Sequence, residues 1–160
     1  MRGFWNTMNE EIKIRLVKED DISILYEHLE EFLETENAST TGNPMPKFED
    51  SEKFVKKYLF DNINHEYEKW YMVLDSQDDI IGNVYITKKN MVSYHILRKY
   101  QRQGFGEKAI SLLMEENPRE KYFATVNIKN TPSINFIKKF GFVEKGYIFE
   151  KDSREMYKKP

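Results

Sequence analysis

The chain has 160 residues with 25 basic and 27 acidic side chains, which give a net charge of -2 at pH 7. This near-neutral balance excludes a protein that binds bulk nucleic acid through its charge. Hydrophobic residues make up 39% and charged residues 32% of the chain, a composition typical of a folded globular domain. The length fits one domain over residues 1–160, and we expect residues 1–10 to form a loosely ordered N-terminal segment.

The chain contains no cysteine. A disulfide framework, a thiolate zinc site and a mechanism through a cysteine thioester are therefore excluded, and we expect no bound metal. No segment approaches the ~20 continuous apolar residues of a membrane span, and residues 1–6 lack the apolar centre of a signal peptide. These features predict a cytoplasmic monomer or homodimer without a nucleic-acid or membrane partner.

The N-terminal half predicts a strand, two helices and a hairpin, in that order. Apolar residues alternate over residues 12–16, the pattern of a half-buried strand, and then recur on one helical face over residues 19–33. Residues 35–50 contain a glycine, two prolines and many small polar residues, and we expect an exposed loop there before a helix over residues 51–59. Residues 70–86 predict two strands joined by a polar turn.

The C-terminal half predicts strands and helices in alternation. A strand over residues 92–97 leads through a loop into a helix that begins after Gly106. A strand over residues 122–127 follows, and then a helix over residues 130–140 with proline in its first turn and glycine at its end. The chain ends in a predicted hairpin, with strands over residues 142–149 and 154–157. This order predicts an α/β (α+β) fold with a mixed sheet flanked by helices.

The loop after the strand at residues 92–97 has the features of a phosphate site. Gly104 and Gly106 let backbone amides approach a ligand, and the start of the following helix directs unpaired N–H groups and a positive dipole end to the same place. The loop also contains three basic residues, Arg98, Lys99 and Arg102. On a nearly neutral chain, this local basic cluster indicates a small anionic ligand.

Two other phosphate-binding motifs fit this loop less well. The two glycines and Ala109 satisfy the spacing of the dinucleotide fingerprint. That fingerprint follows its strand directly, whereas residues 98–103 intervene here, and the next strand ends without an acid to hold a ribose. A P-loop needs a lysine and a hydroxyl residue after its second glycine, which Glu107 and Lys108 do not supply. A dinucleotide-binding oxidoreductase is therefore the less favoured alternative.

Two sequence blocks carry a pattern shared with a known family: residues 101–106 read Gln-Arg-Gln-Gly-Phe-Gly, and Asn130-x-x-Ser133 precedes Phe140-Gly141-Phe142. The first resembles the Q/R-x-x-G-x-G/A motif of the GNAT superfamily of acetyl-CoA-dependent N-acetyltransferases, and the second resembles its next conserved block at the family's spacing. The N-terminal helices are similar to those of the aminoglycoside and ribosomal-protein N-terminal acetyltransferase branches. The resemblance implies the GNAT fold, a mixed, mostly antiparallel central sheet of about seven strands flanked by about four helices.

The resemblance also implies acetyl-CoA as the cosubstrate. The backbone of His95, Ile96 and Leu97 would pair with the pantetheine arm, and backbone amides near the glycines would hold the pyrophosphate. Asn130 would hydrogen-bond the pantetheine, and Phe136 would pack along it or serve as a plain core aromatic. The implied cofactor-binding residues are Ile96, Leu97, Arg102, Gln103, Gly104, Phe105, Gly106, Glu107, Asn130 and Phe136.

Acetyl transfer to an amine needs a neutral nucleophile, a donor for the oxyanion and a proton for the departing thiolate. By resemblance, the oxyanion donor is a backbone N–H at Ile96 or Leu97. Ile137 stands where many family members carry an acid tyrosine, and Thr125 stands where some carry a glutamate base. Ser133 matches a serine that the ribosomal-protein branch places near the sulfur, and its hydroxyl also suits a helix cap.

Candidates for the base and for the acceptor site lie upstream of these residues. His95 is a candidate base on the strand beside the thioester, and Glu31, Glu34 and Glu36 are candidate carboxylates at the end of the first long helix. We expect Glu31, Glu34 and Tyr94 to contact the acceptor, because carboxylates suit a cationic amine. Each of these side chains also fits a structural role, in a strand or on a solvated helix face.

The sequence therefore predicts an enzyme that transfers acetyl from acetyl-CoA to the primary amine of a small molecule or a protein N-terminus. Direct attack in a ternary complex is expected, because there is no cysteine to carry the acetyl group. A non-catalytic acyl-CoA sensor is an alternative, because Ile137 and Thr125 replace the usual acid and base. The acceptor is not specified by any motif.

Overall fold

The computed structural model describes residues 11–33, 67–149, 151 and 153. Its elements are β1 (Lys13–Leu16), η1 (Glu19–Asp21), α2 (Ile22–Leu33), β2 (Tyr67–Leu74), β3 (Ile80–Thr87), β4 (Val92–Ile96), η2 (Arg98–Tyr100), α4 (Phe105–Glu116) and α5 (Thr131–Lys139). No helix in these residues is long and apolar enough to cross a membrane. The predicted loop at 35–50, the helix at 51–59 and the strand at 154–157 lie outside the described residues.

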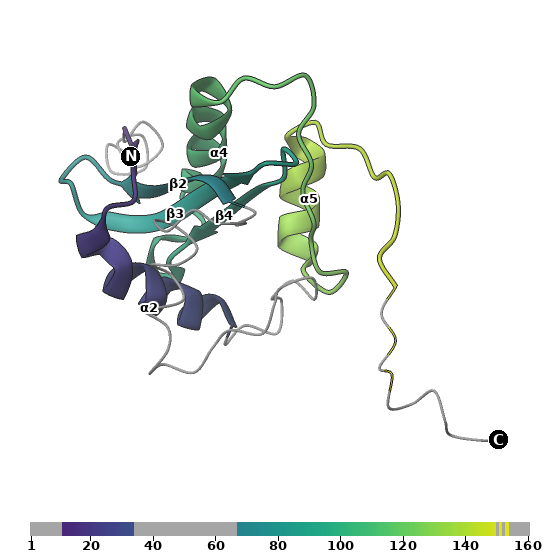
Figure 1. Ribbon diagram of the computed structural model, residues 1–160, viewed down its shortest axis with the longest axis horizontal. Helices are drawn as coiled ribbons and strands as arrows, with labels where there is room; N and C mark the ends of the chain where they lie inside the picture. Colours follow the sequence, from purple (N-terminus) through teal and green to yellow (C-terminus); the bar gives the residue numbers. More distant parts are fainter. Residues whose placement is uncertain (1–10, 34–66, 150, 152, 154–160) are drawn as a thin grey trace, which may run out of the picture.

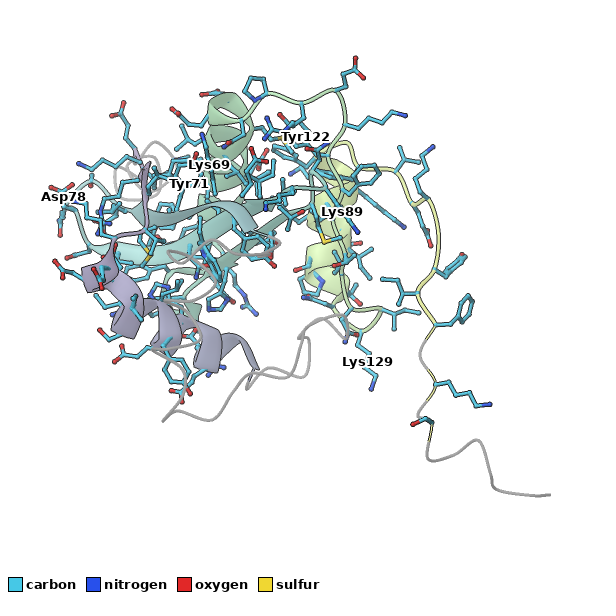
Figure 2. The ribbon with its side chains drawn as sticks, viewed as in Figure 1. Lys69, Tyr71, Asp78, Lys89, Tyr122 and Lys129 are labelled. Carbon is cyan, nitrogen blue, oxygen red and sulfur yellow. The ribbon has the colours of Figure 1, made fainter. Side chains whose placement is uncertain are left out.

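The four strands form one antiparallel sheet in the order β1-β2-β3-β4. The hairpin predicted over residues 70–86 and the strand that follows it are confirmed. Asp78 in the β2–β3 turn and Lys89 in the β3–β4 turn lie at opposite ends of the sheet (Figure 2). The register pairs Asn83 of β3 with His95 of β4, and Val84 with Tyr94. Because neighbouring strand residues point to opposite faces, His95 and Tyr94 face different layers of the molecule.

Helices cover both faces of the sheet, α4 on one and α2 on the other (Figure 1). On the α4 side, Tyr71, Val73, Val84 and Ile96 of the sheet form a core with Phe105, Ala109, Ile110 and Leu113 of the helix. On the α2 side, a smaller core joins Ile22, Leu25, Trp70, Met72 and Leu74. The period of two in the strands and the helical spacing of apolar residues produce this three-layer arrangement.

A partly buried ion pair fixes the start of α2 to β1. Arg15 donates hydrogen bonds of 2.6 and 2.9 Å from its two Nη atoms to the two carboxylate oxygens of Asp21. The backbone N–H of Lys18 donates to the same carboxylate at 2.8 Å, and Asp21 is 5% exposed. The Arg15 guanidinium therefore holds the pKa of Asp21 below its usual range, and the carboxylate stays charged.

The outer strand β4 meets the chain that follows α4 only at its start, within the described residues. The N–H of Val92 donates to the carbonyl of Phe123 at 2.8 Å, and the N–H of Phe123 donates to the carbonyl of Asn90 at 2.9 Å. A single parallel bridge between Met91 and Phe123 results, and the chain then leaves the sheet. The strand predicted over residues 122–127 is thus reduced to one bridge, because its backbone diverges from the neighbour that would extend the ladder.

The chain after α5 runs away from the sheet (Figure 1). Residues 142–149, the predicted first arm of a hairpin, carry no regular secondary structure, and Tyr147, Ile148 and Phe149 are exposed. In the described part of the chain, no neighbouring strand supplies hydrogen bonds to this segment, and an apolar pattern alone does not make a strand. The fold class remains as expected, with an antiparallel sheet flanked by helices and four strands in the described part of the chain.

Candidate active site

The loop before α4 has an unusual backbone. Arg102 (φ 66°) and Gly104 (φ 79°) both adopt the left-handed conformation, and Phe105 begins α4. This conformation is uncommon for an arginine and persists where the surrounding structure fixes it. Successive N–H groups in such a turn, together with the unpaired N–H groups of a helix start, converge on a concave anion site. The phosphate site expected from the sequence therefore has a matching backbone.

This helix start fits the diphosphate of CoA. Among the described residues, no atom beyond Gly104 and its two chain neighbours lies within 4 Å of the position that a Cβ would take at Gly104, so the described part of the chain leaves this space open. The side chains of Arg102 and Glu107 are exposed, and that of Gln103 is half-buried. Phe105, in contrast, is 2% exposed and belongs to the α4-side core. Only its backbone can contribute to the site.

The outer edge of β4 presents the backbone groups of alternate residues. Leu97 donates its N–H to the carbonyl of Ile81 on β3 at 2.9 Å, and Val92 donates its N–H in the other direction. The alternation of antiparallel pairing therefore turns the N–H and C=O groups of Tyr94 and Ile96 away from β3. An extended ligand with amide groups, such as pantetheine, fits this edge.

The backbone N–H groups of Ile96, Leu97 and Arg98, at the end of β4, have different surroundings. The N–H of Leu97 is used within the sheet, and the N–H of Arg98 donates to Glu31 Oε1 at 2.6 Å. The N–H of Ile96 points to the outer edge, where the Ile96 carbonyl accepts a hydrogen bond from Gln101 Nε2 at 2.8 Å. Of the two predicted oxyanion donors, the geometry favours Ile96 over Leu97.

The second conserved block packs against β4 from the α4 side. Asn130 caps α5 by accepting a hydrogen bond from the N–H of Ser133 at 3.3 Å. The Ser133 hydroxyl is therefore not the cap, and its Oγ lies 3.4 Å from the hydroxyl oxygen of Tyr94. The Tyr94 ring meets Phe136 edge-on, with ring centroids 5.1 Å apart. The residues predicted in this block thus come together with Tyr94, which was expected to contact the acceptor.

His95 and Glu31 meet on the opposite face of the sheet. His95 Nε2 lies 3.9 Å from Glu31 Oε1, within the range of charge attraction and beyond that of a hydrogen bond. Burial lowers the pKa of His95, the Glu31 carboxylate opposes this change, and the Arg98 charge adds to it. The imidazole is therefore neutral at pH 7. An open depression of about 400 Å³ beside this pair is lined by Glu31, Leu97, Arg98 and Lys99.

A buried polar network near His95 was not predicted from the sequence. Trp70 Nε1 donates to Asn83 Oδ1 at 3.0 Å, and Asn83 Nδ2 donates to His28 Nδ1 at 3.2 Å. Because the indole nitrogen only donates, it fixes the amide orientation and leaves the His28 proton on Nε2. Burial, followed by the charge of His95, lowers the pKa of His28 to about 4. The sequence carried one signal that His28 lies near the candidate site residues. His28 and Glu31 are three residues apart, so they lie on the same face of one helix.

The sheet separates the predicted site residues into two groups. Tyr94, Ser133 and Phe136 meet on the α4 side, where Asn130 and residues 102–107 also lie. His95 and Glu31 meet on the α2 side. The groups approach each other where β4 ends, at Ile96 and Leu97. Glu34 and Glu36 lie outside the described residues, and in the described part no three histidines or carboxylates gather to hold a metal ion.

The outer strand β4 leads into a glycine loop at the start of α4, and the block of residues 130–142 lies beside this loop. This arrangement is typical of an acetyltransferase domain. The family model described as Acetyltransferase (GNAT) domain matches residues 11–143. The chain belongs to this GNAT acetyltransferase family. An N-alpha-acetyltransferase of Sulfurisphaera tokodaii is 25% identical over an alignment of 107 residues, and the match covers 54% of this chain. The match spans 64% of that protein, less than two thirds of its length.

Solved structures share the fold at low sequence identity. A Vibrio cholerae spermidine N-acetyltransferase in complex with CoA and spermine is 19% identical, with a TM-score of 0.69 over 88% of this chain and 85% of that one. A domain from Methanocaldococcus jannaschii is 17% identical, with a TM-score of 0.67 over 86% of this chain and 91% of that one. These findings confirm the predicted family and the fold class.

Proposed function

We propose that this protein acetylates the primary amine of a small molecule or a protein N-terminus, with acetyl-CoA as the donor. The amine attacks directly in a ternary complex, because the chain has no cysteine to carry the acetyl group. The observation that carries the proposal is the end of β4, where the outward N–H of Ile96 lies between two groups of residues. The left-handed loop of Arg102 and Gly104 serves the donor, and the pair of His95 and Glu31 serves the acceptor.

The donor side is supported by backbone chemistry. The amides from Arg102 to Glu107 would hold the pyrophosphate, and acetyl-CoA would supply an activated acetyl group. The N–H of Ile96 would stabilise the negative charge that grows on the acetyl oxygen. The N–H of Ile96 is held in place by β4 before the reaction begins, so this hydrogen-bond donor needs little reorganisation.

The acceptor side is supported by charge. Glu31 is a half-buried carboxylate at an open depression, which is a favourable place for an ammonium group. The compared proteins named N-alpha-acetyltransferase and spermidine N-acetyltransferase are both named for amine acetylation, which agrees with this class of acceptor. A cationic amine is therefore the proposed acceptor.

His95 is the proposed proton acceptor. An alkyl amine has a pKa near ~10.4, so it must lose a proton before or during attack. The lowered pKa of His95 keeps its imidazole neutral and able to accept that proton, directly or through water. The nearby Glu31 carboxylate then stabilises the imidazolium that forms.

A CoA-release assay over small amines and peptides with free N-termini tests this function. We expect turnover on at least one amine and a higher thermal midpoint with acetyl-CoA than with NAD(H). Stabilisation by acetyl-CoA without turnover on any acceptor would favour the acyl-CoA sensor. A larger stabilisation by NAD(H) would favour the dinucleotide enzyme.

A matched pair of glycine variants tests the donor loop. Gly104→Glu introduces a negative charge beside the proposed pyrophosphate site, and we expect it to abolish acetyl-CoA binding. Gly141→Glu is the control, because Gly141 also has a left-handed backbone (φ 105°) and open space around it, and lies at the far end of α5. Retained acetyl-CoA affinity in Gly104→Glu would mean that the loop does not bind the donor.

A further inference from the structure

The basic cluster that follows β4 divides between two places in the structure. Arg102 lies in the left-handed loop before α4. Arg98 and Lys99 belong instead to η2, and both line the open depression of about 400 Å³. The backbone N–H of Arg98 donates to Glu31 Oε1 at 2.6 Å, which ties this residue to the end of α2. Arg98 and Lys99 are therefore placed at the acceptor depression, and Arg102 at the donor loop.

The depression carries charges of both signs. Glu31 supplies a carboxylate, and the exposed side chains of Arg98 and Lys99 supply two positive charges. The Lys99 ammonium lies 5.1 Å from the centre of the Tyr100 ring, within the range of a cation–π contact. Within the described residues, neither Arg98 nor Lys99 forms a salt bridge with a carboxylate. The described side chains that line the depression therefore have a net positive charge.

The charge of Arg98 is felt at the proposed proton acceptor. Burial lowers the pKa of His95, the Glu31 carboxylate opposes this change, and the Arg98 charge adds to it. The Arg98 guanidinium therefore acts on the same face of the sheet as the His95 and Glu31 pair, and a group that binds it lies beside that pair.

We propose that Arg98 and Lys99 form an anion subsite in the acceptor depression, so that the acceptor is a small amine that also carries a carboxylate or phosphate group. This inference rests on the proposed acetyl transfer and narrows its substrate class. The ammonium group of the acceptor would lie at Glu31, and its anionic group would bind Arg98, whose planar guanidinium suits two oxygens of a carboxylate or phosphate. Lys99 would add a second positive charge.

A polyamine meets the wrong charge in this depression. Its second ammonium group would approach Arg98 and Lys99, and like charges at close range repel. Because both side chains are exposed, water and salt reduce this repulsion to an effect on the order of a few-fold in affinity. An anionic group replaces the repulsion with a charge-assisted hydrogen bond. The subsite therefore selects amines by the charge that they carry away from the reacting nitrogen.

Four amines with the same aminopropyl chain test the subsite in a CoA-release assay. Butylamine, putrescine, γ-aminobutyrate and aminopropylphosphonate end in a methyl, an ammonium, a carboxylate and a phosphonate group, respectively. At low ionic strength, we expect kcat/KM to be about tenfold higher for at least one of the two anionic amines than for butylamine, and lowest for putrescine. The two anionic amines distinguish a carboxylate from a phosphate as the recognised group.

Two substitutions of Arg98 make the test specific to its charge. Arg98→Gln keeps the backbone N–H that donates to Glu31. We expect the ratio of kcat/KM for the preferred anionic amine to that for butylamine to fall about fivefold, with unchanged affinity for acetyl-CoA in calorimetric titration. Arg98→Glu should reverse the order and favour putrescine over both anionic amines. A purely structural role of Arg98 would instead lower the turnover of all four amines equally.

Lys89→Gln is the matched control. It removes one positive charge from the protein, as Arg98→Gln does, and Lys89 is exposed in the β3–β4 turn, before the start of β4 (Figure 2). Arg98 follows the other end of that strand. We expect Lys89→Gln to leave both the order of the four amines and the affinity for acetyl-CoA unchanged.

Three results would overturn the inference. The first is a kcat/KM for butylamine or putrescine that equals or exceeds that for both anionic amines, and the second is an unchanged order in Arg98→Glu. The third is weaker binding of acetyl-CoA in Arg98→Gln, which would place Arg98 at the phosphates of the donor. In each of these cases amines are still acetylated, so the proposed function survives. If no amine or peptide is acetylated, the proposed function and this inference fail together.

Discussion

Replacing His28 with glutamine should remove a specific part of the acid sensitivity of this protein. His28 is 3% exposed, and its Nδ1 accepts a hydrogen bond from Asn83, which requires the neutral ring. Its pKa in the folded protein is lowered to about 4 from an ordinary value of 6.5. Glutamine retains an oxygen that can accept from the Asn83 amide, and it has no proton to gain in this pH range.

The magnitude follows from the two pKa values. Between them, the unfolded chain binds a proton that the folded protein does not, so the free energy of unfolding falls by about 1.4 kcal/mol for each pH unit of acidification. The loss begins near pH 6.5, is complete near pH 4, and amounts to about 3 kcal/mol for this one side chain. At pH 5.5 it is already about 1 kcal/mol, where most carboxylates are still charged.

Urea unfolding of both proteins at neutral pH, near pH 5.5 and near pH 4.5 measures the effect. We expect the stability of wild type to fall more steeply than that of His28→Gln, whatever the packing cost of the change at neutral pH. His95 is present in both proteins, and because its charge acts on His28, the difference between the two curves reports His28 together with this coupling. Parallel stability curves would mean that the folded protein accommodates a charged His28 and that the Asn83 contact does not require the neutral ring.

Three further predictions concern the sheet, the ion pair and the acceptor side. Gly82→Ala would place a Cβ 2.2 Å from the carbonyl oxygen of His95, so β4 must shift; we expect a lower thermal midpoint and a loss of about 100-fold in kcat/KM, measured by CoA release. Asp21→Asn should lower the free energy of unfolding in urea by about 2 kcal/mol at pH 7, because Arg15 loses its charged partner. Since the pKa of Asp21 is lowered in the folded protein, this contribution in wild type persists until the pH falls through that lowered value. Glu31→Gln should raise KM for a cationic amine about tenfold with unchanged affinity for acetyl-CoA; the reverse outcome would make Glu31 a support of the donor loop.

The central part of the fold could be predicted because its signals are local. The alternation of apolar residues predicted β1, a polar turn marked the hairpin of β2 and β3, and glycine and proline marked the ends of α4 and α5. The strand predicted at residues 122–127 depended instead on a partner. Only Phe123 meets the sheet, because a strand forms where a neighbour supplies hydrogen bonds, and sequence periodicity does not identify that neighbour.

The glycine-containing loop and the helix start of the proposed donor site could be predicted, because glycine spacing indicates such a backbone directly. The left-handed conformation of Arg102 could not, because that backbone angle is strained for arginine and comes from the folded surroundings. The network of Trp70, Asn83 and His28 could not be predicted either. It joins three elements that only the register of β2 and β3 and the packing of α2 bring together.

The division of the site between two faces of β4 makes its chemistry depend on strand register. Tyr94 and His95 are adjacent, and the pleat directs the first to the donor side and the second to the acceptor side. A slip of one residue would exchange them, placing a neutral imidazole beside Ser133 and a phenol beside Glu31. Gly82, opposite Ile96, lets β4 approach β3 closely at the point where both sides meet. In the proposed mechanism, the register of β4 positions the proton acceptor His95 relative to the CoA sulfur, so activity would depend on sheet packing as well as on the side chains themselves.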